Sequence, residues 1–275
     1  MPRELTACEK IERSLITKYR KEIWHPFIDA VQRYELVNEG DRIAVCISGG
    51  KDSFCLAKLM QELQKHGRAP FEMIFLVMDP GYTDRNRKMI QFNAGKLEIP
   101  VQIFNSNIFH VAYSQEHSPC YLCAKMRRGW LYSKAKELGC NKIALGHHFD
   151  DVIETTVMSM FYSSELRAML PKLHSDHFSG MELIRPMYKV REEAIIAWKN
   201  YNELDFLQCA CRFTENEAKH PGGSKRQTIK KLIHEMKKDT PDLDQSIFNS
   251  IHSVCLDTFP AWKTGGEQHS FLESY

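Results

Sequence analysis

The chain lacks the features of a membrane or exported protein. Its 275 residues contain no apolar run long enough to span a bilayer. The first residues, Met1-Pro2-Arg3-Glu4, are charged and lack the apolar core of a signal peptide. Internal repeats and low-complexity tracts are also missing. We therefore expect a cytoplasmic protein with no membrane partner.

A strong charge of one sign is missing too. The 37 Lys and Arg residues nearly balance the 35 Asp and Glu residues, which gives a net charge of +2. This balance neither requires nor excludes a nucleic acid partner, so local basic clusters must decide that question. A composition of 43% hydrophobic and 26% charged residues suits one large globular domain with additions.

The most informative stretch is Ser48-Gly49-Gly50-Lys51-Asp52-Ser53. It follows an apolar run of strand length, residues 43–47, and precedes a helical pattern of leucines. Glycines let the backbone approach a phosphate, and the first N–H groups of the helix point at it unpaired. The spacing differs from that of the P-loop, which has four residues between its glycines. It resembles the pyrophosphate loop of ATP pyrophosphatases, which cleave ATP to AMP and pyrophosphate while adenylating a substrate.

Strands and helices are expected to alternate through the middle of the chain. The predicted strands cover residues 43–47, 71–78, 100–105 and 142–145. Helices between them imply βαβ units and a parallel sheet, so the fold class is α/β. Ligands of such sheets bind beyond the carboxyl ends of the strands. Asp79 and Gly146-His147 follow two of these strands and should join the glycine loop in one site.

Helical additions are expected on both sides of this domain. The predicted division is an N-terminal helical segment, 1–40, a nucleotide-binding domain, 41–212, and a helical extension, 213–275. The expected helices cover residues 4–34 with a break or kink at Pro26, 85–97, 151–161, 191–202, 225–236 and 246–259. Residues 162–185 show no periodicity, and a loose tail is expected from Lys263 onward.

Nine cysteines fall into two groups. Structural disulfides are not expected in the cytosol. The isolated ones, expected to be small buried side chains, are Cys8, Cys46, Cys55, Cys140 and Cys255. The others form two close pairs, Cys120 with Cys123 and Cys209 with Cys211. Paired thiolates suit a redox pair, a zinc site or an iron–sulfur cluster, and the spacing alone leaves all three open.

Together these motifs resemble the tRNA 2-thiocytidine synthetase family, cytoplasmic enzymes that place sulfur on a cytidine of the tRNA anticodon loop. The resemblance runs from about Asp41 to Cys211. The matching segments are the glycine loop, Pro119-Cys120-Tyr121-Leu122-Cys123 with Arg127-Arg128-Gly129, Gly146-His147-His148-Phe149-Asp150-Asp151, Pro171-Lys172-Leu173 and Ile184-Arg185-Pro186.

The resemblance implies an ATP-pyrophosphatase (PP-loop) fold, Mg-ATP, tRNA as substrate and a sulfur donor such as a cysteine desulfurase. It also implies a [4Fe-4S] cluster on three cysteines, with zinc as the alternative metal. Cys120 and Cys123 match two cluster ligands, and the third is Cys211 or Cys209, with a preference for Cys211. A homodimer is the commonest soluble assembly and is expected on that ground.

The expected chemistry is adenylation of the cytidine C2 carbonyl, followed by replacement of its oxygen with sulfur. The glycine loop and Lys51 would hold the leaving pyrophosphate. Asp52, with Asp150 or Asp151, would bind Mg²⁺, although the last two could instead cap a helix. By resemblance, His147 lies near the nucleotide. In the absence of a cluster, Cys120 or Cys123 could carry a persulfide.

RNA contacts are expected from basic clusters. They are Arg127-Arg128, Lys172, Arg185, Lys225-Arg226 and Lys230-Lys231. Tyr121 and Phe149 are candidates for stacking on a flipped base. Two other functions compete: a PP-loop enzyme acting on another tRNA base or small molecule, and a zinc-stapled adaptor that binds ATP and RNA.

Overall fold

The computed structural model describes residues 3–67, 69–106, 108, 119–207, 224–273 and 275, with the backbone alone for 119–124. The chain forms two compact units. The first comprises Met1–Val152 and Met169–Ser224, and the second comprises Ile153–Ala168 and Lys225–Tyr275. The N-terminal helices therefore belong to the same unit as the glycine loop. The predicted boundary at residue 212 lies outside the described residues.

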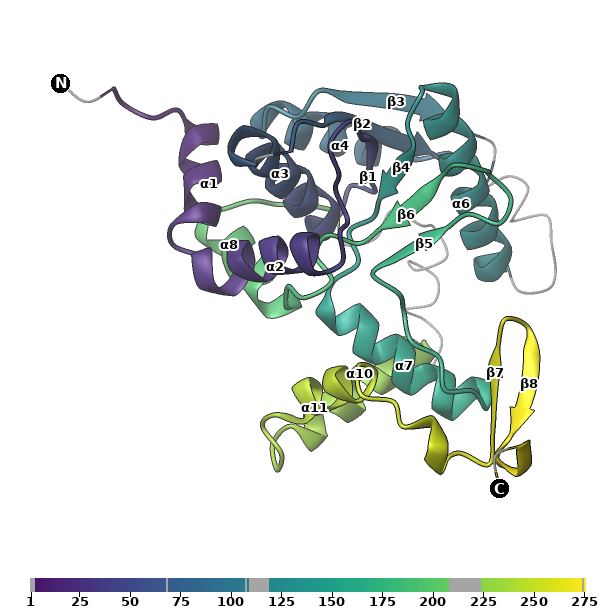
Figure 1. Ribbon diagram of the computed structural model, residues 1–275. Helices are drawn as coiled ribbons and strands as arrows, with labels where there is room; N and C mark the ends of the chain where they lie inside the picture. Colours follow the sequence, from purple (N-terminus) through teal and green to yellow (C-terminus); the bar gives the residue numbers. More distant parts are fainter. Residues whose placement is uncertain (1–2, 68, 107, 109–118, 208–223, 274) are drawn as a thin grey trace. The chain divides into compact units, whose positions relative to one another are not determined.

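A six-stranded sheet organises the first unit, in the order β3-β2-β1-β4-β6-β5 (Figure 1). The strands are β1 Arg42–Ile47, β2 Glu72–Asp79, β3 Val101–Asn105, β4 Lys142–Ala144, β5 Lys172–His174 and β6 Glu182–Ile184. All neighbours are parallel except β5, which runs antiparallel to β6 at the edge. The predicted parallel α/β sheet is confirmed, and the four predicted strands end within one residue of the observed bounds.

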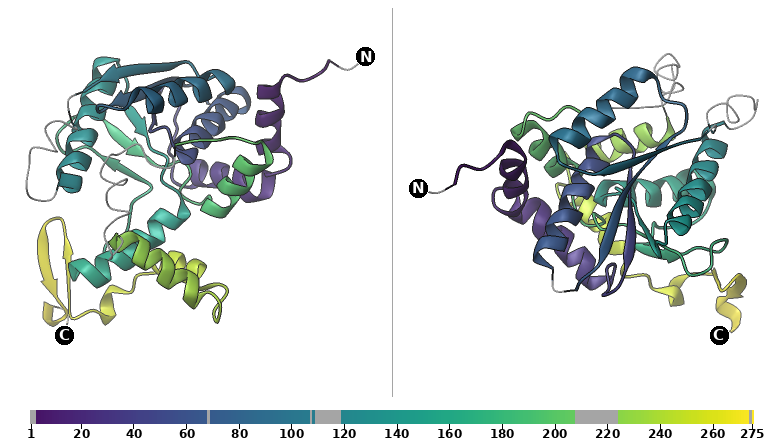
Figure 2. Two further views of the ribbon diagram at one scale, coloured as in Figure 1. Left: turned by 180° about the vertical axis from the view of Figure 1, so that it is seen from behind. Right: turned by 90° about the horizontal axis from the view of Figure 1, so that it is seen from above.

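Helices cover both faces of the sheet, as the views in Figure 2 show. On one face, Ile43, Val45 and Ile47 of β1 pack in a core with α1 Ala7–Ile16, α2 His25–Arg33, α3 Lys51–His66, α4 Asp84–Lys96 and α8 Glu192–Tyr201. On the other face, Ala44 and Cys46 pack against α6 Pro119–Glu137. Because successive strand residues point to opposite faces, the apolar run of β1 fills both cores.

The N-terminal helix is interrupted before Pro26. Thr6 and Glu9 form a reciprocal capping box at the start of α1, which ends at Ile16. A short π-helix, Arg20–Trp24, then leads into α2. Pro26 lies in the first turn of α2, where a missing N–H group has no cost. The break that we expected at Pro26 therefore lies before it, around residues 17–19.

Three stretches differ from the sequence-based expectation. Residues 162–185 contain β5 and β6, which are too short, at three residues each, to show a period. The helix expected over 246–259 begins earlier and ends earlier, because α11 covers Leu243–Ser250. Just beyond its end, the His252 ring contacts the Phe248 carbonyl oxygen. The tail after Lys263 is not loose: β7 Ala261–Thr264 and β8 Glu267–Ser270 form a hairpin. Its turn, Gly265-Gly266, uses two positive φ angles that glycine adopts readily.

The second unit consists of the end of α7 (Phe149–Ser163), α10 Lys225–Met236, α11 and the hairpin. Ile229, Ile233 and Phe248 are its most buried apolar side chains on α10 and α11. Lys237 Nζ lies 2.6 Å from a carboxylate oxygen of buried Asp244, which ties α10 to α11. Among the helices that the structure describes, none is long and apolar enough to cross a membrane.

Candidate active site

The predicted phosphate loop joins β1 to α3, and no side chain in the described part of the chain caps the first N–H groups of the helix. Gly50 is the N-cap residue of α3. Ser53 Oγ donates to the Gly50 carbonyl oxygen at 2.9 Å, which fixes the turn without occupying the N–H groups. The first N–H groups of a helix and its positive dipole end favour an anion. The loop is therefore built to accept phosphate oxygens.

Two glycines of the site are required by close packing. Gly49 has φ +93°, and a Cβ atom there would lie 2.8 Å from Leu207 Cδ1 and 2.9 Å from Ile90 Cγ1. A Cβ atom on Gly146, at the end of β4, would lie 3.2 Å from the Ser53 backbone nitrogen. Gly146 thus lets the β4 loop rest on the first turn of α3.

We expect Gly49→Ala to destabilise the fold by about 1–3 kcal/mol, since it combines an unfavourable φ with overpacking against Leu207 and Ile90. Gly95→Ala is the matched control, because this glycine of α4 has open space at its Cβ position and an ordinary helical φ. The control should stabilise the protein by about 0.5–1 kcal/mol. Urea unfolding of both variants measures this difference, and equal effects would contradict the packing argument.

Lys51 is the centre of a charge network at the start of α3. Its Nζ lies 3.0 Å from a carboxylate oxygen of Asp52 and 3.0 Å from one of Glu192, the first residue of α8. Burial by itself would lower the pKa of Lys51, but attraction to Asp52 and the hydrogen bond to Glu192 outweigh it and raise the pKa. Lys51 is therefore a fixed cation beside the helix N-terminus.

Asp150 and Asp151 hold the ends of two helices. Asp151 accepts a hydrogen bond from the His148 N–H at 3.0 Å, at the start of α7. Asp150 accepts from the Glu192 N–H at 2.7 Å and so caps α8, a helix distant in sequence. Buried His148 lies 3.5–3.8 Å from carboxylate oxygens of Asp52, Asp150 and Asp151. The capping interpretation of both aspartates is confirmed, and the oxygens that cap also lie 3.5 and 3.6 Å from ring nitrogens of His148.

The remaining predicted site residues lie at the same edge of the sheet. Asp79 ends β2, but its buried carboxylate accepts from the N–H groups of Gly81 and Tyr82 at 2.9 and 2.7 Å. It also lies 3.4 Å from Arg87, so its immediate role is to shape the turn after β2. His147 is half-buried in the loop that follows β4.

Sequence reasoning missed Glu192 and His148. Glu192 pairs with Lys51, which is 141 positions away in the sequence, and no local sequence pattern predicts this contact. For His148, the only signal was the adjacent pair of histidines, and we favoured His147. The interpretation of Phe149 as a stacking platform is wrong in this structure. Its ring is buried, and the Arg191 guanidinium lies 4.5 Å from the ring centroid.

The paired cysteines are only partly described. Cys120 and Cys123 belong to the first turns of α6, but their side chains lie outside the described residues, as do Cys209, Cys211 and the side chain of Tyr121. In the described part of the chain, no three His, Cys, Asp or Glu side chains are grouped to hold a metal ion.

The isolated cysteines mostly behave as buried hydrophobic residues, as expected. Cys8, Cys46, Cys55 and Cys140 are buried, and burial raises the pKa of Cys46 to about 12. Such thiols remain protonated and unreactive at neutral pH. Cys255 is the exception, because it is exposed in the loop after α11.

The parallel sheet, the uncapped glycine loop and its lysine define the class as a PP-loop nucleotide-binding protein. The model of the PP-loop domain matches residues 17–213. Proteins named tRNA-cytidine(32) 2-sulfurtransferase are similar over most of the chain. The Vibrio campbellii protein is 34% identical, with 86% of this chain and 78% of that protein covered. The Pelobacter propionicus protein is 31% identical, with 92% and 91% covered. The chain belongs to the tRNA-cytidine(32) 2-sulfurtransferase family.

A solved structure shares the fold. The U34-tRNA thiolase NcsA from Methanococcus maripaludis, solved with its [4Fe-4S] cluster, superposes with a TM-score of 0.66. It is 20% identical in sequence, and the match covers 84% of this chain and 77% of that chain.

Proposed function

We propose that this protein is an ATP-dependent tRNA sulfurtransferase that thiolates a cytidine of the anticodon loop at C2. The family supports the reaction class. The observation that carries the ATP-dependent step is Lys51, held by Asp52 and Glu192 beside the uncapped start of α3. Position 32, which the relatives' names give, is the proposed position of that cytidine.

The first step is activation of a poor leaving group. The C2 oxygen of the cytidine attacks the α-phosphorus of ATP, the bond to the β-phosphate breaks, and pyrophosphate leaves with the electron pair. The N–H groups of the glycine loop and Lys51 bind the pyrophosphate as its charge develops. A sulfur nucleophile then attacks C2, and AMP departs with the former oxygen.

Carboxylates of Asp52 and of Asp150 or Asp151 suit the Mg²⁺ that accompanies ATP. They present hard oxygen ligands around His148, and Asp52 also contacts Lys51. Mg²⁺ in nucleotide sites takes one or two carboxylates together with phosphates. The four carboxylates of Asp52, Asp150, Asp151 and Glu192 outnumber Lys51 and Arg185, the cations that act on them, which favours a further cation. Asp79, Gly146, His147 and Ser48 complete the proposed nucleotide site.

The cysteines are proposed to hold a [4Fe-4S] cluster through Cys120, Cys123 and Cys211, with Cys209 as the alternative third ligand. Thiolates are the donors that such clusters use. Leu207 donates its N–H to the Gly49 carbonyl oxygen at 3.2 Å, and Cys209 follows only two residues later. When bound, the cluster supplies an iron without a protein ligand.

Nucleoside analysis is the decisive experiment. Cells that lack the gene should lack 2-thiocytidine in their tRNA, and the wild-type gene should restore it. Cys123→Ser should fail to restore it, whereas Cys140→Ser, at a buried cysteine between α6 and β4, should succeed. Unchanged 2-thiocytidine in the deletion strain would exclude the cytidine assignment and favour another base or a small molecule.

Metal analysis tests the cluster separately. Protein purified without oxygen should be brown and contain about three to four irons per chain. A colourless protein with one zinc would exclude the cluster and favour a zinc-binding adaptor that binds ATP and RNA. We also propose a cysteine desulfurase as the sulfur donor, a homodimer, a cytoplasmic location, and a division of the chain at residues 40 and 212.

A further inference from the structure

Helix α10 of the second unit has a buried apolar side and an exposed basic side. Ile229 and Ile233, one turn apart on the helix, are buried, at 1% and 7% exposed. Residues two positions apart on a helix point to nearly opposite sides. Lys231 lies two positions from each isoleucine, and its side chain is exposed. The packing of the isoleucines therefore turns Lys231 toward solvent.

The positive charges of α10 are concentrated in its first ten residues. Residues 225–234 include no carboxylate and four cations, which are Lys225, Arg226, Lys230 and Lys231. The carboxylates of this region come later in the chain and are Glu235, Asp239, Asp242 and Asp244. The positive end of a helix dipole lies at the first turn and favours acidic side chains there, but α10 has none in that turn. Side-chain charges and dipole therefore add, and this half of α10 favours an anionic partner.

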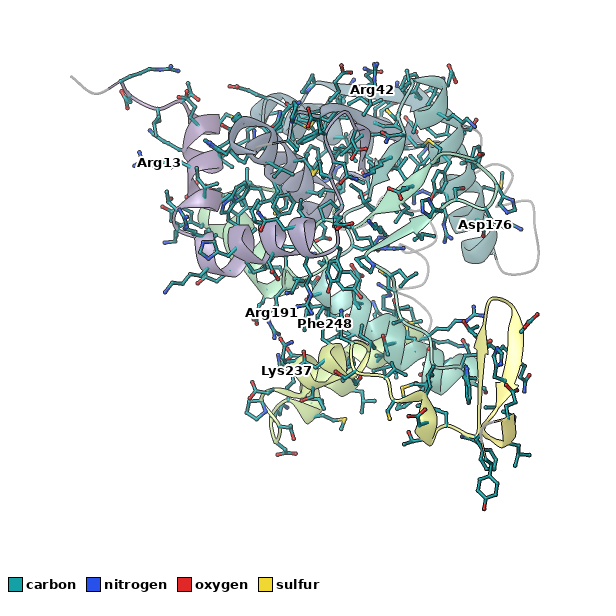
Figure 3. The ribbon with its side chains drawn as sticks, in the orientation of Figure 1. Arg13, Arg42, Asp176, Arg191, Lys237 and Phe248 are labelled. Atoms are coloured by element: carbon teal, nitrogen blue, oxygen red, sulfur yellow. The ribbon has the colours of Figure 1, made fainter. Side chains whose placement is uncertain are left out.

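Contacts within the second unit engage some of these cations. Arg226 lies 3.6 Å from a carboxylate oxygen of buried Glu154 and donates to the Thr155 hydroxyl at 3.3 Å, which ties α10 to α7. Lys237, just beyond the end of α10, lies 2.6 Å from Asp244 of α11 (Figure 3). These two side chains stabilise the packing of the unit.

The exposed side of α10 carries a different set of cations. Lys231 forms no ion pair in the part of the chain that the structure describes. Lys230 precedes it, His234 follows it by one turn, and both are exposed. We call Lys230, Lys231 and His234 the basic face of α10. Because these side chains project into solvent, a large polyanion can reach them.

This face fits the backbone of a nucleic acid better than the surface of a membrane. A helix that lies on a membrane inserts its apolar side among the lipids, whereas Ile229 and Ile233 of α10 are already buried in the protein. Lysine ammonium groups act as point charges toward phosphates, and phosphate contacts hold a nucleic acid without reading its sequence. A tRNA offers such phosphates well beyond the nucleotide that is modified.

We propose that the basic face of α10 binds the phosphate backbone of the tRNA substrate, with Lys231 at its centre. This inference rests on the proposed function. The second unit then supplies affinity, and the active site selects the cytidine. Of the two basic pairs expected to contact RNA, Lys230-Lys231 meets the backbone, whereas Arg226 of the other pair stabilises the unit.

Lys231→Gln is the sharpest test. Its melting temperature should equal that of the wild type, since the side chain is exposed and forms no ion pair among the described residues. The dissociation constant for tRNA, measured by filter binding, should rise roughly three- to fivefold, and the slope of log K against log salt should become shallower by about 1. Substrate tRNA and a tRNA without cytidine at position 32 should lose the same factor. A loss confined to the substrate tRNA would show base recognition and overturn the proposal.

Lys263→Gln is the matched control, since Lys263 is an exposed lysine of the same unit that lies on β7 of the hairpin. It should change the dissociation constant for tRNA less than twofold, and equal losses in both variants would show a general effect of charge and overturn the proposal. In assays of pyrophosphate release, Lys231→Gln should raise the KM for tRNA and leave kcat unchanged. A lower kcat at saturating tRNA would show a role in the reaction and overturn the proposal.

The outcomes separate this proposal from the proposed function. If the wild-type protein does not bind tRNA, the proposed function fails. If it binds tRNA and Lys231→Gln binds equally well, the basic face alone is overturned. Vesicles of phosphatidylglycerol test the other anionic surface. Vesicle binding that Lys231→Gln abolishes, with tRNA binding unchanged, would assign the basic face to a membrane and overturn the RNA assignment.

Discussion

Lys51→Ala should lower ATP-dependent pyrophosphate release by at least about 10²–10³-fold. The side chain supplies the one ammonium group beside the start of α3 within the described network, and it is held there by Asp52 and Glu192. Removing one group that stabilises developing charge in a shielded site has an effect of this size. The measurement is pyrophosphate release with tRNA and Mg-ATP at saturation.

Two variants make this result interpretable. Lys10→Ala, an exposed lysine of α1, should leave the rate unchanged. Glu192→Gln removes the charge that positions Lys51 but leaves the ammonium group in place, so its loss should be smaller than that of Lys51→Ala. If Lys51→Ala retains the wild-type rate, Lys51 does not contact the phosphates. If neither variant nor the wild type releases pyrophosphate, the protein is an adaptor and not an enzyme.

Lys58→Met should lower the free energy of unfolding by about 3–5 kcal/mol. Lys58 lies fully buried in α3, and its Nζ donates to Glu12, to Gln61 at 2.7 Å and to the Leu97 carbonyl oxygen at 2.9 Å. Removing Lys58 leaves Glu12 with Lys65, at 2.7 Å, as its remaining partner, so its charge is only partly compensated. Gln61 and the Leu97 carbonyl oxygen also lose their donor. Burial by itself would raise the pKa of Glu12, but Lys58 and Lys65 lower it in the intact protein.

A second substitution separates the ion pair from packing. Adding Glu12→Gln to Lys58→Met removes the charge that Lys65 alone compensates only partly, so part of the lost stability should return. Lys10→Met serves as the control, because its contact with Glu4 is long and exposed and should contribute less than about 1 kcal/mol. Urea unfolding measures all four free energies. A double variant less stable than Lys58→Met would show that Glu12 stabilises the fold independently of Lys58.

Much of the fold could be predicted because its signals are local. The run from Ile43 to Ile47 is apolar on both faces, as a central parallel strand requires. The glycines after it allow a tight turn, and φ +93° at Gly49 bears this out. β5 and β6 gave no usable signal, since each has three residues and depends on its neighbour for hydrogen bonds. The hairpin at the end of the chain was missed although Gly265-Gly266 is a typical turn.

Site residues that directly follow strands could be predicted from the sequence. Their partners from distant parts of the sequence could not. Parallel strands bring their carboxyl ends to one edge, so Asp52, Asp79 and Gly146 were expected together. The cap that Asp150 provides for α8 has no counterpart in any local pattern. Phe149 looked available in the sequence, but the packing of α7 on Val190 and Arg191 buries its ring.

By itself, the sequence determined the parallel sheet, the glycine loop and the pairing of the cysteines, because each depends on residues within one or two turns of chain. The tertiary structure alone decided that Glu192 holds Lys51. This contact joins residues 141 positions apart in the sequence. It exists only after α3 and α8 have packed on the same face of the sheet.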